Sequence, residues 1–190
     1  MNKSFLKKKI IILNNYKRKK YCLGICVLNE GSKIKNQIKK IKKHNFQDLD
    51  IIICDGGSDD NSINIKFLKK NKIKELLIKN ANGHLSYQIM LILEHAIQKS
   101  YKGLILMDGN DKDSVKEIPE FIDVIMNTVF KEHTDIEVVL FGHIGDGNLH
   151  INALKPDSLS MDEFVAKCET VNKVLFEEIR KIGGSISAEH

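Results

Sequence analysis

Four short apolar runs alternate with helix-like stretches, and this alternation limits the possible folds more than any other feature of the chain. The runs have the length of strands and occupy residues 21–28, 49–54, 73–78 and 103–107. Between them, apolar residues recur at the three- and four-residue spacing of amphipathic helices. Strands that alternate with helices predict a mostly parallel sheet with helices packed on it, and therefore an α/β fold.

Three helices are expected between these runs. Ser32 is a suitable N-cap for the first helix, and residues 61–70 are suited to the second. The apolar face of the first helix would consist of Ile34, Ile38 and Ile41. The apolar stripe of the third would consist of Leu85, Ile89, Leu93, Ala96 and Ile97.

The composition is that of a globular protein. Of the 190 residues, 42% are hydrophobic and 29% are charged, so a packed core is expected and extensive disorder is not. The apolar runs are too short for a transmembrane helix, and the lysine-rich start lacks the apolar centre of a secretory signal. We therefore expect a cytoplasmic protein, at most peripheral to a membrane, whose four cysteines are reduced.

Positive charge is concentrated in the first two thirds of the chain. Residues 1–130 contain 24 Lys and Arg against 14 Asp and Glu, a net of +10, whereas residues 131–190 contain 6 against 11, a net of −5. A shift this sharp suggests two segments of different origin. Residues 1–20 are most simply a basic, solvated N-terminal tail, which could also hold the chain near an anionic membrane surface. No aromatic residues interleave with the lysines, so nucleic-acid binding is not expected.

Acidic clusters follow two of the predicted strands. Asp55 begins the cluster DGGSDD after the second strand, and Asp108 begins DGNDKD after the fourth. Ligands of parallel α/β sheets bind outside the carboxyl ends of the strands, where both clusters would lie. Their oxygen atoms would suit Mg²⁺ or Mn²⁺ held against the phosphates of a nucleotide. Taken alone, each cluster is also typical of a turn that closes a strand–helix connection.

The order of these segments resembles the inverting family 2 glycosyltransferases of GT-A fold, in particular the branch that uses polyprenyl-phosphate acceptors. The resemblance covers residues 21–122 and rests on LGICVLNEG, DIIICDGGSDDNS and NGHLSYQIMLILEHAIQKSYKGLILMDGNDKDSVKEIPEFI. It implies a Rossmann-like half sheet that binds a nucleotide-diphosphate sugar. The residues that would contact the nucleotide are Leu28, Glu30, Asp55 and Asp108.

The same resemblance implies a metal site. Asp108 and Asn110 would stand where the family has its metal-binding DxD motif. Here the second carboxylate is an amide, which would weaken the Mg²⁺ or Mn²⁺ site or shift it to Asp111 or Asp113. Nothing after residue 122 resembles the family's acceptor site or catalytic base, so this domain is expected to be truncated.

The stretch VVLFGHIGDGNLHIN predicts a β-hairpin. Asp146 and Gly147 are typical of a two-residue turn, here between strands at residues 138–143 and 150–154. This turn places His143 opposite His150, and strand alternation puts Asn152 on the same face. Two opposed imidazoles can share one divalent cation, or they can be two partly exposed histidines without a ligand.

A helix is expected after the hairpin. Ser160 and Glu163 have the spacing of a capping box, and Gly183 is a suitable end. Its apolar stripe is expected to face a core and consists of Phe164, Cys168, Val171, Leu175, Ile179 and Ile182. The last stretch, GGSISAEH, predicts a short strand that carries a carboxylate and an imidazole.

Residues 117–190 resemble the C-terminal domain of FAD-linked oxidases of the glycolate oxidase, D-lactate dehydrogenase and D-2-hydroxyglutarate dehydrogenase type. The stretches GHIGDGNLHIN and GGSISAEH carry this resemblance. It implies that a zinc-like divalent metal is bound by His143, His150 and Glu189. It also implies that His190 is the base toward a 2-hydroxy acid and that Asn152 contacts this substrate. The metal would lower the pKa of the substrate hydroxyl, and FAD would accept the hydride. The family's FAD-binding domain has no counterpart in the sequence, so FAD is expected in the parent family only.

Both families have a segment like IPEFI, so residues 117–122 fit either parent. The two resemblances predict a chimera: a truncated glycosyltransferase-like nucleotide-sugar domain joined to an α+β oxidase fragment that is truncated at both ends. We expect such a chain to be inactive in isolation. A join at a short segment common to both families favours an accidental chimera. A bifunctional protein and a divergent protein with a single function are the alternatives. Two other functions stay open, namely an FAD-linked oxidoreductase fragment that acts on a 2-hydroxy acid with a divalent metal, and a basic surface-binding module without catalysis.

Overall fold

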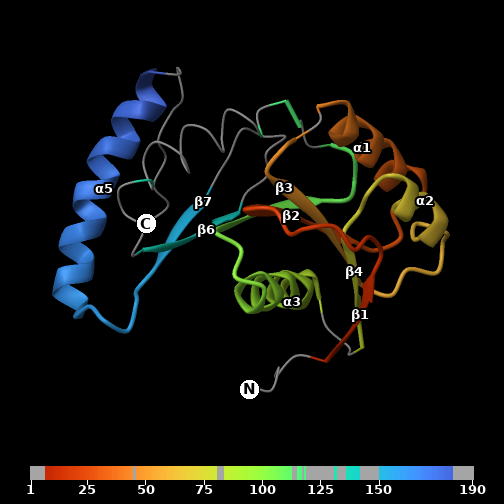
Figure 1. Ribbon diagram of the computed structural model, residues 1–190, viewed down its shortest axis with the longest axis horizontal. Coiled ribbons are helices and arrows are strands. Elements are labelled where there is room, and N and C mark those ends of the chain that lie inside the picture. Colours follow the sequence, from red (N-terminus) through yellow and green to blue (C-terminus); the bar gives the residue numbers. More distant parts are fainter. Residues whose placement is uncertain are drawn as a thin grey trace. The chain divides into compact units, whose positions relative to one another are not determined.

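The computed structural model describes residues 7–44, 46–80, 84–112, 115–116, 118, 131, 136–141 and 150–181, with residues 137–141 and 150–152 described by their backbone. A five-stranded sheet forms the centre of its first part (Figure 1). The strands are β1 (Lys8–Ile12), β2 (Tyr21–Val27), β3 (Leu49–Asp55), β4 (Glu75–Lys79) and β5 (Gly103–Asp108). Their order across the sheet is β1-β4-β3-β2-β5.

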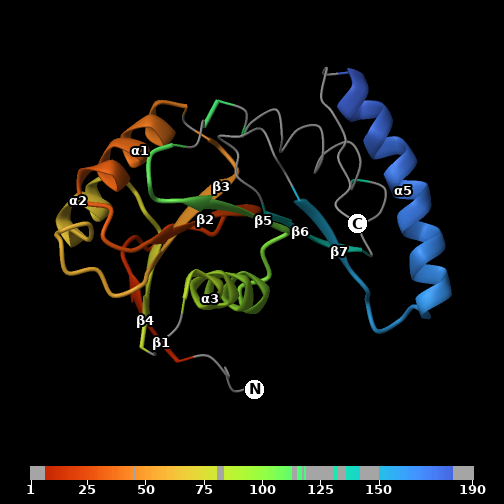
Figure 2. The same cartoon turned by 180° about the vertical axis from the view of Figure 1, so that it is seen from behind.

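Four of these strands are parallel neighbours, as predicted. β2 pairs in parallel with β3 and β5, β3 pairs in parallel with β4, and β1 runs antiparallel to β4. Figures 1 and 2 show α1 (Ser32–Lys43) and α2 (Ile65–Lys70) on one face of the sheet and α3 (Leu85–Gln98) on the other. Every residue of β2 and β3 is buried, because helices cover both faces of the sheet. The predicted α/β class is confirmed.

The helices agree with the sequence to different degrees. The apolar face predicted for α1 is confirmed, since its three isoleucines are fully buried. The stripe predicted for α3 is wrong in part, because Leu85 and Ile97 are exposed by 46% and 51%. The residues that α3 buries are Gln88, Leu91, Ile92, His95 and Ala96. The buried face therefore includes two polar side chains with partners in the sheet, which a pattern of apolar residues does not detect.

Two boundaries also differ from the prediction. The expected solvated tail, residues 1–20, contains β1, whose Lys8 forms an ion pair with Glu94 of α3 at 2.8 Å. Consecutive lysines and isoleucines give no alternation, so this strand had no signal of its own and is formed by pairing with β4. α2 begins at Ile65 because the side chain of Asn64 accepts a hydrogen bond from the Phe67 backbone N–H at 2.9 Å.

One glycine in β2 sets the distance between the sheet and α3. A Cβ on Gly24 would lie 2.5 Å from Ile92 Cγ2. Both residues belong to or contact a core of buried apolar side chains shared by α3 and the sheet. A larger residue would force the helix away from the strand, so glycine is required here for packing rather than for a turn.

The chain divides into two compact units, residues 1–116 with 139–151, and residues 117–138 with 152–190. Of the later elements, β6 (Glu137–Phe141) pairs with β7 (His150–Leu154) in a separate two-stranded sheet, and α5 (Met161–Lys181) follows. The predicted hairpin strands thus do pair, while the residues of the predicted turn lie outside the described part of the chain. Within the described part, no helix has the length and apolarity that crossing a membrane requires.

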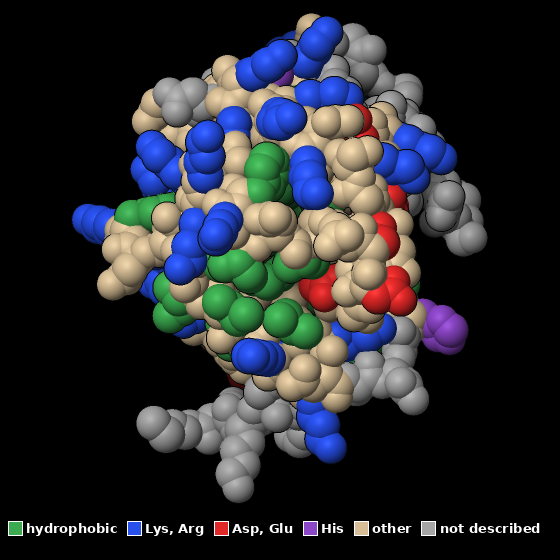
Figure 3. Space-filling model, turned by 90° about the vertical axis from the view of Figure 1, so that its right-hand side faces the viewer, with side chains coloured by type: hydrophobic (Ala, Val, Ile, Leu, Met, Phe, Trp, Pro, Cys, Tyr) green, Lys and Arg blue, Asp and Glu red, His purple; other side chains and the backbone are tan. Residues whose placement is uncertain are grey.

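The described surface keeps the basic character of the sequence. On the face seen in Figure 3, Lys and Arg side chains lie around a group of hydrophobic side chains, and Asp and Glu gather at one side. Ile10 and Ile12 of the edge strand β1 are exposed by 42% and 61%. Charged side chains on an edge strand, here Lys8 and Lys9, oppose pairing with another chain.

Candidate functional site

The carboxyl end of β2 lies between the two acidic clusters. In the sheet register, Asp55 of β3 is opposite Val27, and Asp108 of β5 is opposite Cys26. The chain moves from β2 through β3 to β4 and then returns to β5 on the other side of β2. This reversal is the topological switch point at which open α/β sheets bind ligands. The structure therefore brings the two predicted aspartates to the two sides of one strand end.

Two loops at this end are joined by hydrogen bonds. The backbone N–H of Asn29 donates to Ser58 Oγ at 3.0 Å, and the backbone N–H of Asp59 donates to Asn29 Oδ1 at 3.0 Å. The Gly31 N–H donates to Asp60 Oδ2 at 2.8 Å, and Asn29 and Gly31 both have φ near +53°. The pKa of Asp60 is lowered, first by its hydrogen bond with the Ser62 hydroxyl. The residues that follow β2 are thus held in a fixed, left-handed backbone shape.

The two carboxylate oxygens of Asp55 differ in their hydrogen bonds. It is 5% exposed, and its Oδ1 accepts hydrogen bonds from Ser58, at 3.0 Å from the backbone N–H and 2.7 Å from the hydroxyl. Its Oδ2 accepts no hydrogen bond from a described residue, so this atom is available to a donor from a ligand. Of the other two residues predicted at the nucleotide, Leu28 is 51% exposed, and Glu30 forms an ion pair with Lys33 at 3.3 Å.

A glutamine of α3 supports this end of the sheet. The side-chain amide of Gln88 donates to the carbonyl oxygens of Val27 at 3.0 Å and Cys54 at 2.8 Å, and the residue is 2% exposed. A Cβ on Gly56 would lie 2.9 Å from Gln88 Oε1, so a side chain at position 56 would displace this amide. Sequence reasoning missed Gln88. Its signal is a polar residue three and four positions before two buried apolar ones, Leu91 and Ile92.

The residues of the DxD-like motif are arranged as a turn. Asn110 Oδ1 accepts a hydrogen bond from the Lys112 backbone N–H at 3.0 Å, and Asp111 forms an ion pair with Lys40 of α1 at 2.9 Å. Asp111 has φ of +62°, and Asp113 lies outside the described residues. Among the residues that the structure describes, no three His, Cys, Asp or Glu side chains form a group that could hold a metal. Asp108 and Asn110 can offer two oxygen atoms, which fits Mg²⁺ only where substrate phosphates and water complete its shell.

The predicted metal site of the second segment falls mostly outside the described residues. His143, Glu189 and His190 are not described, while His150 and Asn152 lie on β7, two positions apart, as backbone. Their roles therefore stay predictions.

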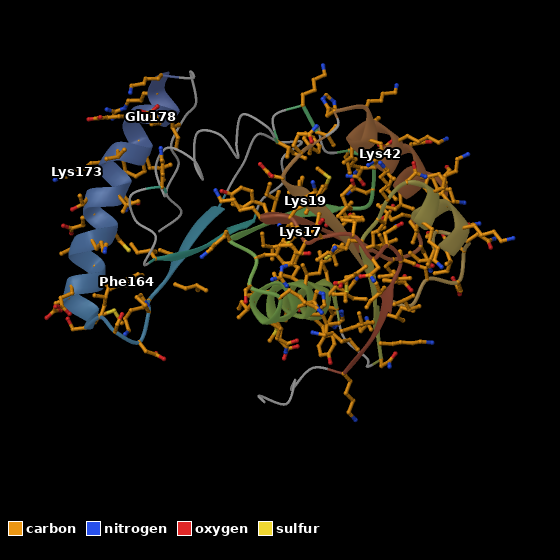
Figure 4. The ribbon with its side chains drawn as sticks, in the orientation of Figure 1. Lys17, Lys19, Lys42, Phe164, Lys173 and Glu178 are labelled. Atoms are coloured by element: carbon orange, nitrogen blue, oxygen red, sulfur yellow. The ribbon has the colours of Figure 1, made fainter. Side chains whose placement is uncertain are left out.

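The helix of this segment agrees with its prediction. Ser160 and Glu163 form the capping box: Ser160 N–H and Oγ donate to Glu163 Oε2 at 2.9 and 2.7 Å, and the Glu163 N–H donates back to Ser160 Oγ at 3.3 Å. Val171 and Leu175 are buried. Figure 4 shows the half-buried Phe164 and the exposed Lys173 on different sides of α5, as an amphipathic helix requires. The stripe is thus confirmed as the more buried side, and Ile182 and Gly183 lie outside the described residues.

Comparison with known proteins concerns mainly the second segment. Residues 112–190 match the family described as FAD linked oxidases, C-terminal domain. A D-2-hydroxyglutarate dehydrogenase of Stutzerimonas stutzeri is 54% identical over 77 residues, which are 40% of this chain and 17% of that protein. The D-2-hydroxyglutarate dehydrogenase of Xanthomonas citri is 47% identical over 76 residues, 40% of this chain and 16% of that protein.

A third relative is a protein of Schizosaccharomyces pombe named as a mitochondrial D-lactate dehydrogenase. It is 33% identical over 141 residues, 73% of this chain and 23% of that protein, so this match also takes in residues ahead of position 112. The chain spans less than a quarter of the length of these relatives. No solved structure is significantly similar to it. These matches support the oxidase resemblance and give no support to the glycosyltransferase resemblance of residues 21–122.

Proposed function

We propose that residues 112–190 are part of the substrate domain of an FAD-linked dehydrogenase that oxidises a 2-hydroxy acid of the D-2-hydroxyglutarate type. The observation that carries this proposal is the family match over these residues, together with two relatives of about half identity that are named D-2-hydroxyglutarate dehydrogenase. The described strands β6 and β7 and the helix α5 are compatible with it, because they form the pairing and the capped helix expected of that segment.

In this proposal, His143, His150 and Glu189 hold a zinc-like divalent metal. The donor set of two imidazoles and one carboxylate suits zinc and leaves a coordination position open for a substrate. His190 accepts the proton of the substrate hydroxyl, and Asn152 orients the substrate. In the parent protein, bound FAD would supply the oxidant, as acceptor of the hydride from the carbon that bears this hydroxyl.

Zinc content tests the metal site. We expect the purified chain, loaded with zinc and dialysed, to retain about one equivalent, and a variant with His143→Ala and His150→Ala to retain none. A variant with His44→Ala and His84→Ala is the matched control, because both histidines are exposed and lie in the first unit. Equal zinc in the wild type and the His143/His150 variant would reject the site.

A second function is proposed for the first unit, namely binding of a nucleoside diphosphate with Mg²⁺ or Mn²⁺ at the carboxyl end of β2. It is favoured by the position of Asp55 and Asp108 on the two sides of that strand end, at the switch point of the sheet. A nucleotide-diphosphate sugar is the substrate class, and polyprenyl phosphate is the acceptor that the resemblance suggests.

Calorimetry with UDP and GDP, with and without Mg²⁺, tests this function. We expect metal-dependent heat that Asp108→Asn abolishes. Asp59→Asn removes the same charge from an exposed residue and should leave the heat unchanged. No metal-dependent heat with either nucleotide would reject the proposal and favour the alternative that the first unit also derives from an oxidase.

A further inference from the structure

A pocket lies at the amino end of β3, the end of this strand opposite to that of the acidic clusters. Its volume is about 540 Å³, and its walls come from the segment between β1 and β2, the end of α1, and the start of β3. Leu49, the first residue of β3, lines it, whereas Asp55 is the last residue of the same strand. The pocket is thus separate from the nucleotide site proposed above and has the size of sites that enclose small molecules.

Four lysines line this pocket: Lys17, Lys19, Lys42 and Lys72. Figure 4 labels three of them, two from the segment before β2 and Lys42 from the last turn of α1. None of the four forms an ion pair with a described residue. Burial, and then the like charge of Lys72, lowers the pKa of Lys42. The pocket therefore holds several positive charges that the described part of the protein does not neutralise.

The buried carboxylate of Asp50, between the lining residues Leu49 and Ile51, is bound by groups of the protein. Asp50 is fully buried, and its Oδ2 accepts hydrogen bonds from the Lys19 backbone N–H at 3.0 Å and the Tyr101 hydroxyl at 2.8 Å. Lys74 lies 3.9 Å from the same oxygen. Asp50 is thus bound by groups of the protein core. It forms no ion pair with the four lysines of the pocket, whose ammonium groups are available to an anion from solution.

Two aromatic rings give the pocket an apolar side. Phe46 is half-buried, and Tyr16 is fixed by its hydroxyl, which donates to the Lys72 carbonyl at 3.1 Å. The Tyr16 carbonyl accepts a hydrogen bond from Lys74 Nζ at 2.6 Å, and this ammonium also lies 4.1 Å from the Tyr16 ring centroid. Burial raises the pKa of the Tyr16 phenol above its ordinary value. Tyr16 is therefore held in place before any ligand arrives.

The backbone of Lys72 adds an independent observation. It has φ of +55° and follows the C-cap of α2, where its N–H donates to the Lys69 carbonyl at 3.0 Å and the Ile73 N–H to the Leu68 carbonyl at 3.1 Å. This is the helix-ending position that glycine usually occupies, and a side chain there costs about 1 kcal/mol. A long cationic side chain is held at the pocket in spite of this cost.

We propose that this pocket binds a small phosphorylated molecule with an aromatic or apolar body. The phosphate would contact the lysine ammonium groups, and the body would lie against Tyr16 and Phe46. A pocket of this kind gains affinity from both parts, because charge-assisted hydrogen bonds fix the phosphate while the rings remove apolar surface from water.

Calorimetry with phenyl phosphate, inorganic phosphate and phenol as probes tests this inference on the full chain. We expect phenyl phosphate to bind more tightly than inorganic phosphate, and phenol to give no heat. A variant with Lys42→Gln and Lys72→Gln should bind phenyl phosphate at least about tenfold more weakly. The matched control, Lys39→Gln with Lys70→Gln, removes two exposed charges outside the pocket, one from α1 and one from the last residue of α2, and should change the affinity less than about twofold.

Several results would overturn the proposal. One is the absence of heat with phenyl phosphate in the wild type, and another is an equal loss in both lysine variants, which would indicate only a general charge effect. Equal affinity for phenyl phosphate and inorganic phosphate would show that the rings of Tyr16 and Phe46 do not contribute to binding. Loss of phenyl phosphate binding in Asp108→Asn would place the bound anion at the carboxyl end of β2, in the nucleotide site proposed above. Tight binding of a single-stranded oligonucleotide without binding of phenyl phosphate would favour nucleic acid instead. Circular dichroism of each variant establishes that it is folded.

Discussion

Two buried glutamines of the first unit should respond in opposite ways to the same substitution. Gln88 is 2% exposed and donates two hydrogen bonds to carbonyl oxygens at the ends of β2 and β3. Gln37 of α1 is fully buried, and neither its Nε2 nor its Oε1 has a hydrogen-bond partner among the described residues. Methionine has nearly the size and flexibility of glutamine, so Gln→Met changes polarity with little change in packing.

The expected magnitudes follow from these contacts. A buried amide–carbonyl hydrogen bond contributes about 1 kcal/mol net, and Gln88 makes two of them. A buried carbonyl that loses its donor also costs desolvation free energy, so Gln88→Met should lower the free energy of unfolding by about 2–3 kcal/mol. Gln37→Met removes a buried polar group that has no partner and should leave the free energy of unfolding unchanged or raise it by about 1 kcal/mol. With a urea m-value of about 2 kcal/mol/M, the midpoint should fall by about 1–1.5 M in the first variant and stay or rise in the second.

Tyrosine fluorescence during urea unfolding is the assay. The chain has four tyrosines and no tryptophan, and all four lie within residues 1–116, so this signal reports the first unit. A fall of similar size in both variants would refute the reasoning, because the effect would then come from packing volume rather than from hydrogen bonding. Glu178→Met, a substitution on α5, leaves every tyrosine contact in place and should leave the midpoint unchanged.

Three further predictions concern a buried ion pair, the cysteines and a glycine at the end of a strand. The hydrogen bond from His95 holds the pKa of Glu75 below its ordinary value of 4.5, so this buried pair stabilises the fold at higher pH and the stabilisation is lost as pH falls through the lowered pKa. Urea midpoints between pH 6 and pH 3 should therefore decrease more steeply in the wild type than in Glu75→Gln, and parallel slopes would contradict this. Burial raises the pKa of all four cysteines, that of Cys54 to about 12, but only Cys168 is partly exposed, so brief treatment with iodoacetamide should modify Cys168 first. Intact mass should show one adduct in the folded chain and four in urea, and early labelling of a strand cysteine would be inconsistent with the sheet. A Cβ on Gly109 would lie 2.9 Å from the Cys26 carbonyl oxygen, so Gly109→Ala should cost about 1–3 kcal/mol in the tyrosine assay; an unchanged midpoint would show that this strand end is not rigid.

Much of the first unit could be predicted from local sequence. The apolar runs of β2, β3 and β5 were found almost to the residue, because a strand buried on both faces has a continuous apolar composition. The capping box of α5 was found from two residues, since it depends on contacts within one helical turn. The matches to FAD-linked oxidases bear out the resemblance of the second segment, while the nucleotide-sugar resemblance of the first remains a prediction.

The sequence by itself determined which segments other than β1 are strands and helices, and that acidic clusters follow β3 and β5. These properties depend on neighbours in the chain. Only the tertiary structure decided that β1 joins the sheet, that α3 buries Gln88 and His95, and that lysines from three separate segments line one pocket. Each of these depends on partners twenty or more residues apart in the sequence or on the pairing of whole elements. Hydrogen bonds and charges at such separations leave no periodic trace in the sequence, because the energy that selects them exists only after the sheet has formed.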